Sequence, residues 1–426
     1  MKSAKLLAAA CLLLLTLPVV VGMAQQRLGW VGPIYVELSE SLKKGFQDYY
    51  LRTYGEPIEI TFVRPGGWPV CVDRVRIWDG KPDADVFLGA GAPAHSVLAS
   101  LGLTVPYVHA HWDMIPAQWQ GMNARDPDGY WSAFAPWLVS NMYNELVLRM
   151  YNVPPPLTWD DLLNPIYRGH IAMCLTYASG TMYEVAQIQL QTRGWRDGWA
   201  YLRYLAAQVG RWTTGSTDTT HNVTRGEYPI GIAQPQMNAM VARRDGYPVG
   251  NLVPDVTVLV PEAAALLAGA PNERNAKIFL DWLYSMEGQK YVLQGGYFVA
   301  RTDISLKQWQ AEGVGMASHA IAALGGADNF WDVDLDLLDY DLELATAQWD
   351  EVNKYFDEQI YRKWDELKST LSQIEAVELQ IEDAKAKGTD VAAAQAKAAE
   401  ARTLFEEGEL AAARTAVTEA RALLRR

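Results

Sequence analysis

Strands and helices alternate through the first third of the chain, and this alternation restricts the fold more than any other feature. The segment 39–54 keeps its apolar side chains on one helical face, 58–63 alternates as a strand, and 85–88 is a short apolar strand. This alternation predicts a mostly parallel sheet covered by helices. Because ligands on such sheets bind beyond the carboxyl ends of the strands, we expect the loops 64–68 and 89–92 to face a binding site.

A second compact unit is expected because 426 residues exceed what one hydrophobic core usually holds. The nearly uninterrupted apolar stretch 131–144 predicts a strand that crosses between two lobes, and 247–260 predicts the return. The predicted boundaries are 1–24 for a signal peptide, 25–135 for the first part of lobe 1, 136–245 for lobe 2, 246–340 for the second part of lobe 1, and 341–426 for a helical extension.

The C-terminal extension has its own composition, with few glycines and prolines and many Ala, Glu, Lys and Leu residues. Apolar residues recur every three or four positions from 349 to 381, which predicts one long amphipathic helix. Breaks at Gly388 and Gly408 then delimit two shorter, alanine-rich helices. The extension is thus predicted to be an all-α, coiled-coil-like hairpin module, and it could serve as a spacer, a docking site or an oligomerisation element.

The N-terminus predicts export. Lys2 and Lys5 precede the apolar run 6–21, and small residues at 22 and 24 suit a signal peptidase. We expect a periplasmic, cell-surface or extracellular protein, or a membrane-associated one if the apolar run is kept as an anchor. Cys71 and Cys174 fall on different predicted lobes, so we expect two buried free thiols.

Charge and motifs exclude several classes of function. A formal net charge of −13 and a pI near 5.0 argue against a nucleic-acid partner, because phosphate binding needs a basic surface. The sequence has no nucleophile elbow, Walker loop or paired zinc cysteines. His109 and His111 are close together, but two histidines without a third ligand are weak evidence for zinc. We therefore expect no catalytic residues, no metal and no cofactor.

The segment 178–184, Ala-Ser-Gly-Thr-Met-Tyr-Glu, is the strongest candidate for ligand contact. It follows the apolar strand 171–175 and should open a helix, where free backbone N–H groups and the helix dipole favour an anion. The alternative is a simple helix cap made by Ser179 or Thr181. The segment 215–220 adds hydroxyl groups and is predicted to be a polar loop.

Several segments, in a fixed order, resemble one protein family. They are 81–87, with Pro-Asp-Ala-Asp-Val-Phe, the segment 157–184, the Gly-Glu-Tyr-Pro-Ile-Gly run at 226–231, and the late helix 276–289. They resemble family 1 extracellular solute-binding proteins of ABC importers, most closely the ferric-iron branch. The resemblance implies a type 2 periplasmic-binding-protein fold with two hinge strands, a small solute bound between the lobes, hinge closure, and a membrane permease as partner.

Iron itself is not the favoured solute. The resemblance implies two adjacent tyrosines soon after the second crossing strand, but 233–240 contains none. A small organic anion therefore fits better, with ferric iron or an iron chelate bound without the tyrosine pair as one alternative. An exported interaction or scaffold protein that uses the helical tail, with self-association through it, is the alternative of another class. The candidate ligand-binding residues are Arg64, Gly66, Gly67, Trp68, Gly91, Ala92, Ser179, Gly180, Thr181, Ser216, Thr217, Thr219, Thr220 and Gln234.

Overall fold

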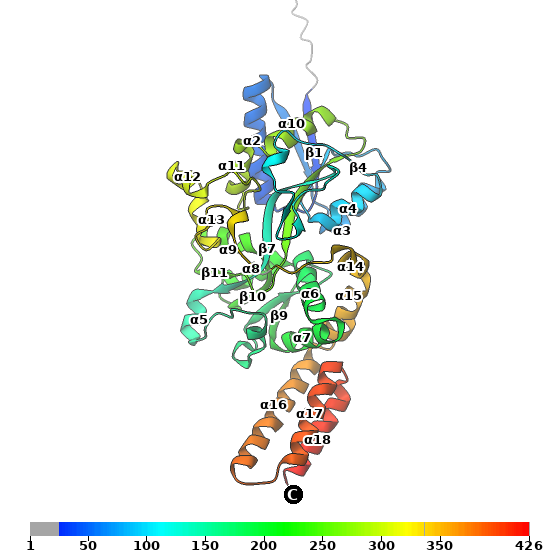
Figure 1. Ribbon diagram of the computed structural model, residues 1–426, viewed down its shortest axis with the longest axis vertical. Helices are drawn as coiled ribbons and strands as arrows, with labels where there is room; N and C mark the ends of the chain where they lie inside the picture. The colour runs from blue at the N-terminus through cyan, green and yellow to red at the C-terminus, as the bar shows by residue number, and fades with distance from the viewer. Residues whose placement is uncertain (1–24, 336, 426) are drawn as a thin grey trace, which may run out of the picture.

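The computed structural model describes residues 25–335 and 337–425, and its two lobes lie one above the other with a helical bundle below them (Figure 1). The predicted signal peptide, 1–24, lies outside the described residues. Within the described ranges, no helix combines the length and the apolar composition needed to cross a membrane.

The first lobe is built on the predicted βα units. Strands β1 (Gln26–Val31), β2 (Ile58–Val63) and β3 (Val86–Leu88) are parallel, with β1 in the middle. Each strand alternates with a helix because buried side chains on both sheet faces need a helical cover. The helices of this lobe are α2 (Val36–Tyr54), α3 (Trp68–Ile77), α4 (Ala92–Ser100), α10 (Glu273–Leu283), α11 (Met286–Gln294), α12 (Leu306–Ala311) and α13 (Ala317–Ala323).

The predicted crossing strand is β7 (Ser132–Asn144), buried along nearly all its length. Its first half pairs with β12 (Leu259–Leu267), and its second half pairs with β10 (Ile230–Pro235) and β11 (Val249–Leu252). The chain therefore passes to the second lobe along β7 and returns from β11 into β12. Strand β7 and the segment from β11 to β12 are therefore the two hinge connections of the predicted fold.

The second lobe repeats the same construction. Strand β8 (Ile171–Cys174) lies between β10 and β9 (Val209–Thr213), parallel to both. Its helices are α5 (Glu145–Tyr151), α6 (Gly180–Arg193), α7 (Trp195–Gln208), α8 (Ser216–Thr224) and α9 (Gln236–Arg244). In the first lobe the short strand β4 (Thr104–Val105) pairs with β12, and β5 (Gln118–Trp119) and β6 (Met122–Asn123) form a separate two-stranded sheet.

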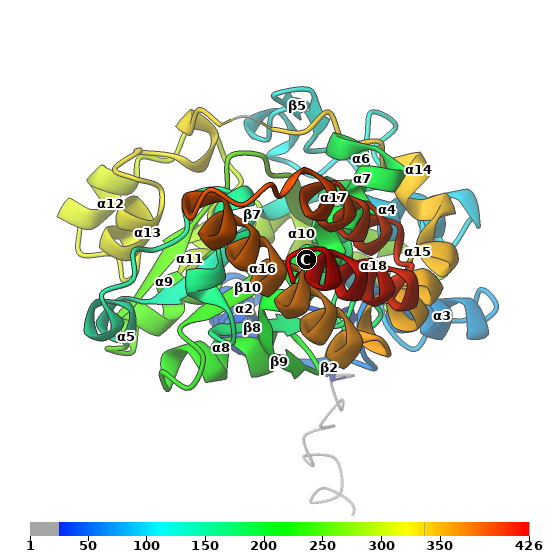
Figure 2. The ribbon, with the colours of Figure 1, turned by 90° about the horizontal axis from the view of Figure 1, so that it is seen from below.

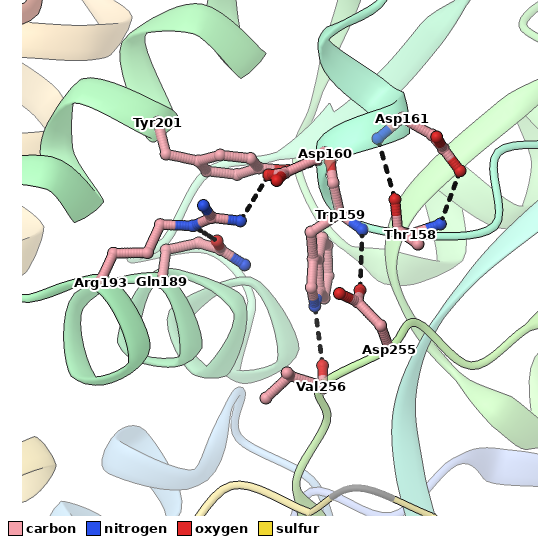
Figure 3. A network of polar contacts seen from close by, with 9 residues as sticks. All are labelled: Thr158, Trp159, Asp160, Asp161, Gln189, Arg193, Tyr201, Asp255 and Val256. Atoms are coloured by element: carbon pink, nitrogen blue, oxygen red, sulfur yellow. Dashed lines mark hydrogen bonds and ion pairs between the residues drawn. The ribbon is translucent and has the colours of Figure 1, made fainter.

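A polar network ties the second lobe to the returning hinge segment (Figure 3). The Trp159 backbone N–H donates to Asp255 at 3.0 Å, and its indole Nε1 donates to the Val256 carbonyl at 2.7 Å. The Tyr201 hydroxyl donates to the Trp159 carbonyl, and Arg193 pairs with Asp160. Trp159 is 1% exposed, so this indole fills the core while it fixes the chain just before β12.

The C-terminal extension differs from the single long helix predicted for 349–381. Helix α14 (Leu342–Ala347) and helix α15 (Trp349–Phe356) lie on the second lobe, and a π-helical turn at Asp357–Tyr361 separates them from α16 (Trp364–Ala386). The turn occurs because Phe356, Tyr361 and Trp364 all pack around the Trp212 ring of the second lobe. A π-helical turn bends a helix in this way.

The last three helices, α16, α17 (Ala392–Glu407) and α18 (Leu410–Leu423), form a bundle under the second lobe (Figures 1 and 2). Buried alanines on α17 and α18 allow the close packing that the sequence indicates. Arg168 holds Glu375 of α16 through two hydrogen bonds of 2.7 Å. The bundle therefore extends the long axis of the molecule on the side away from the first lobe.

The extension also crosses between the lobes, which was not predicted. The Leu338 N–H donates to the Thr257 carbonyl beside the hinge, and the Asp341 N–H donates to Gln191 of α6. Residues 337–356, which we call the strap, thus leave the hinge and run over the second lobe. They make a third connection between the lobes.

Candidate binding cleft between the lobes

A cleft of about 900 Å³ lies between the lobes. The strand ends explain its position: β2, β3, β8 and β9 all end at the cleft, and each is followed by a helix that begins there. Helices α3, α4, α6 and α8 therefore all present their N-termini to one space. Helix N-termini carry backbone N–H groups without intrahelical partners and a partial positive charge, which suits an anion.

The N-terminus of α6 combines a helix cap with first-turn N–H groups at the cleft, those of Gly180 and Thr181, which we call the α6 cradle. The Ser179 hydroxyl accepts from the Met182 N–H at 3.4 Å, so the simple cap considered from the sequence is present. The same hydroxyl bonds to Ser216 at 2.9 Å and so links α6 to α8. Gly180 and Thr181 both line the cleft, and their N–H groups belong to the first helical turn.

The segment 215–220 is the start of a helix, not the predicted polar loop. Gly215 has an extended backbone and directly precedes α8. Ser216 and Thr217 line the cleft. The sequence signal was present, because a glycine followed by Ser, Thr and Asp is typical of a helix start.

Three of the predicted ligand residues are outside the cleft lining. The Thr219 hydroxyl is fully buried and bonds to Thr213 at 2.6 Å and to Cys174 at 3.1 Å. The Thr220 hydroxyl donates to Gln234 at 2.7 Å, and the Gln234 side chain is also fully buried. The helical period turns Thr219 and Thr220 of α8 away from the cleft, and the bond from Thr220 to Gln234 braces α8 against β10.

The other predicted residues meet at the cleft from both lobes. Arg64 lies at its wall, with Nε donating to the Pro33 carbonyl at 3.2 Å and the guanidinium 5.4 Å from the Tyr35 ring centre. Among the described residues, no carboxylate lies within ion-pair distance of Arg64, so its charge is available. The cleft-lining residues predicted from the sequence are Arg64, Gly66, Gly67, Trp68, Gly91, Ala92, Ser179, Gly180, Thr181, Ser216 and Thr217.

Two buried carboxyl groups were missed by the sequence analysis. Glu262 lies on β12 and accepts from the Trp137 indole at 3.2 Å, and Glu184 lies on α6, one turn beyond Gly180. Burial raises the pKa of each of these carboxyls to about 7. A glutamate within the apolar run Leu-Val-Pro-Glu-Ala-Ala-Ala of β12 was a signal that could have identified Glu262.

The strap forms one wall of the cleft, which the sequence analysis also missed. Asp339, Tyr340 and Leu342 line the cleft. Trp349 lies with its ring centre 5.3 Å from that of Trp68 on the first lobe and 4.4 Å from that of Tyr183 on the second. A single strap side chain therefore contacts both lobes.

Cys71, Cys174, His109 and His111 lie outside the cleft lining, whereas His221 is part of it. Cys71 and Cys174 are buried free thiols. The His109 ring stacks on Tyr284 with ring centres 3.6 Å apart. Across residues 25–335 and 337–425, no three His, Cys, Asp or Glu side chains form a group that could hold a metal ion.

Known proteins are similar to this chain in sequence. An uncharacterized protein of Haemophilus influenzae is 26% identical over 260 residues, which are 61% of this chain and 73% of that protein. A periplasmic protein of Salmonella typhimurium, provisionally assigned to 2-aminoethylphosphonate binding, is 23% identical over 70% of this chain and 84% of its own length.

Solved structures show the same two-lobe fold. The periplasmic binding protein AfuA from Actinobacillus pleuropneumoniae, solved with fructose-6-phosphate, has a TM-score of 0.62 at 23% identity and covers 79% of this chain and 99% of its own. Iron-bound HitA from Pseudomonas aeruginosa has a TM-score of 0.56 at 18% identity and covers 70% of this chain and 98% of its own. A family model described as bacterial extracellular solute-binding protein matches residues 81–309, which is more than half of the chain, and the protein therefore belongs to this family of ABC-importer binding proteins.

Proposed function

We propose that the protein is the exported capture subunit of an ABC importer and binds a small anionic solute in the cleft. The convergence of four helix N-termini on one cleft carries this proposal, since each favours negative charge. Arg64 adds a guanidinium that can hold a phosphate, phosphonate or carboxylate through two hydrogen bonds. The fructose-6-phosphate bound to AfuA and the aminoethylphosphonate assignment of the Salmonella relative agree with this class of solute.

Both lobes contribute groups that a solute can touch together. Arg64 and Trp68 come from the first lobe, and Ser179, Gly180 and Thr181 come from the second. A solute that contacts both sets stabilises the lobe arrangement in which they meet, and by no more than this difference in affinity. The closed form is then what a membrane permease would recognise.

The binding test uses protein purified without added solute. Thermal shift against inorganic phosphate, ethylphosphonate, glucose 6-phosphate, citrate and ferric citrate should identify an anion, because a ligand at 100 times its Kd stabilises by about 2.7 kcal/mol. The proposal fails if none of these anions, nor any other small phosphate, phosphonate or carboxylate, stabilises the protein.

Thr181→Val tests the α6 cradle. Valine keeps the size of the side chain but removes the hydroxyl, so anion affinity should fall roughly 10- to 100-fold by calorimetry, the range expected for a hydrogen bond to a charged group. Thr224→Val is the matched control, because Thr224 is a partly buried residue at the end of α8, outside the cleft lining. Equal affinity in the two variants would remove Thr181 from the site.

Ferric iron is the second candidate, and the strap supplies an observation for it. Tyr340 brings a phenol hydroxyl beside the Glu184 carboxyl at the cleft, and oxygen donors of this kind suit a hard trivalent ion. A visible charge-transfer band on adding ferric citrate, lost in Tyr340→Phe, would favour iron. Binding of organic phosphates without such a band would favour the anion.

We propose a binding role without turnover. Solute recovered from the protein after prolonged incubation should have an unchanged mass, whereas a converted product would show an enzyme. The candidate interaction or scaffold role of the bundle is separable: truncation after Lys363 keeps the strap, so solute binding should persist. Comparison of the two chains by light scattering then tests self-association through α16, α17 and α18.

A further inference from the structure

The cleft contains more negative than positive side chains, which an anionic solute alone does not explain. Arg64 is the one arginine or lysine among the described lining residues. Asp126 and Asp218 accept hydrogen bonds from nearby backbone N–H groups, so they have structural partners. The remaining lining carboxylates are Glu184, Glu262 and Asp339.

Glu262 has an oxygen that is left without a partner. The residue is 9% exposed, its Oε1 accepts from the Trp137 indole at 3.2 Å, and its buried Oε2 makes no hydrogen bond. The charged and titratable groups around it are Arg64, Tyr35 and Tyr297. A buried carboxylate oxygen without a partner is costly, so a partner is expected to arrive with the ligand.

Glu184 repeats this situation on the second lobe. Its buried Oε2 also makes no hydrogen bond of normal geometry, and the polar group that lies beside it is the Tyr340 hydroxyl. Glu184 lies one turn along α6 from the Gly180 cradle. Each lobe therefore offers the cleft one anion-binding element and one carboxyl: Arg64 with Glu262 on the first lobe, and the α6 N-terminus with Glu184 on the second.

We propose that the solute is a zwitterion, a small molecule whose protonated amine is received by Glu262 and Glu184 while its anionic group lies at Arg64 and the α6 N-terminus. This inference rests on the proposed function. An ammonium group donates up to three hydrogen bonds and so can satisfy an unpartnered carboxylate oxygen such as Oε2 of Glu262. A solute without the amine leaves them unpaired and brings a like charge to them, which sites of this kind reject strongly.

Matched pairs of ligands test the amine directly. Calorimetry at pH 8 would compare 2-aminoethylphosphonate with ethylphosphonate, phosphorylethanolamine with ethyl phosphate, and glucosamine 6-phosphate with glucose 6-phosphate. In at least one pair the amine member should bind about tenfold tighter or more, as expected for charge-assisted hydrogen bonds. Glu262→Gln should reduce this ratio towards one while the amine-free member keeps its affinity.

Glu40→Gln is the control, because Glu40 is an exposed residue of α2 outside the cleft. Glu184→Gln gives a second route if the Glu262 variant folds poorly, which its thermal midpoint would reveal. Equal affinity within every pair, or an amine preference that survives in both glutamine variants, would overturn the inference and leave the anion site standing. Failure of all six compounds and of inorganic phosphate to bind would overturn the proposed function as well.

The pH dependence of ligand affinity is a further test of the zwitterion. Because burial raises the pKa of both carboxyls to about 7, the preference for the amine member over its amine-free partner should grow as pH rises from 6 to 8 and the carboxylates ionise. The ratio within a pair is used because the phosphate or phosphonate of both members also loses a proton, with a pKa of about 6 for a phosphate. A preference that falls over this range would contradict the zwitterion.

Discussion

Two kinds of connection join the lobes, and they respond differently to rotation. The hinge consists of β7, β11 and β12, which are tied by backbone hydrogen bonds. The strap contacts the first lobe through side chains, with Leu342 packed on the cluster that contains Trp131 and with Trp349 against Trp68. Backbone torsions in a hinge can absorb a rotation without loss of its hydrogen bonds, whereas side-chain contacts at the cleft wall must slide or separate.

This difference separates fold stability from lobe position. The hinge and the network behind it are buried and fix the structure, so changes there should appear in the free energy of unfolding. The strap contacts are partly buried and lie at the cleft wall between the lobes, so changes there should appear in the distance between lobes. Variants of hinge residues and of strap residues can test this difference.

The largest effect is expected from Trp159→Ala, on the hinge side (Figure 3). The change removes a fully packed indole and its hydrogen bond to Val256, so the free energy of unfolding should fall by about 3–5 kcal/mol. Chemical denaturation measures this loss. Trp159→Phe is the graded control and should cost less, and an alanine variant as stable as the parent would contradict a structural role for this network.

The second effect is the pH dependence of stability that Glu262 creates. Burial raises its pKa to about 7, so the folded state binds the proton more tightly than the unfolded chain does. Stability is therefore greatest below the unfolded pKa and is lost as pH rises through 7, by up to about 3 kcal/mol. Denaturation of solute-free protein at pH 5 and pH 8 should show a smaller loss in Glu262→Gln than in the parent, and equal losses would argue against a buried carboxyl.

The parts of the fold that depend on neighbouring residues could be predicted from the sequence, and the parts that depend on distant contacts could not. Local patterns predicted the βα units, β7 as a crossing strand, and the α6 N-terminus, because each depends on neighbouring residues. The orientation of Thr219 and Thr220 depended on whether 215–220 is a loop or a helix, and the helix turned both side chains away from the cleft. The composition of 215–220 does not distinguish a polar loop from a helix.

Long-range contacts account for the rest. Nothing local distinguishes Glu184 from other residues of a helix start, and the Tyr340 hydroxyl that lies beside its carboxyl is 156 positions away in the sequence. The end of the strap was predicted as the start of one long helix, since nothing local indicates that Trp349 meets both Trp68 and Tyr183. Such contacts are set by tertiary packing and leave no periodic signal.

The smallest energetic effect, and the sharpest test of the comparison, is expected from Trp349→Ala. Its two aromatic contacts are each worth about 0.5–1.5 kcal/mol beyond area burial, so the loss of stability should be modest. The distance between a dye pair placed on the two lobes should nevertheless shift or broaden, because the lobe arrangement that brings Trp68 and Tyr183 to one indole loses its support. Trp195→Ala is the matched control, since its aromatic partners Trp199 and Tyr355 lie on the second lobe and the strap. If both variants keep the parent distance distribution, the strap only covers the second lobe, and the hinge alone determines the relative position of the two lobes.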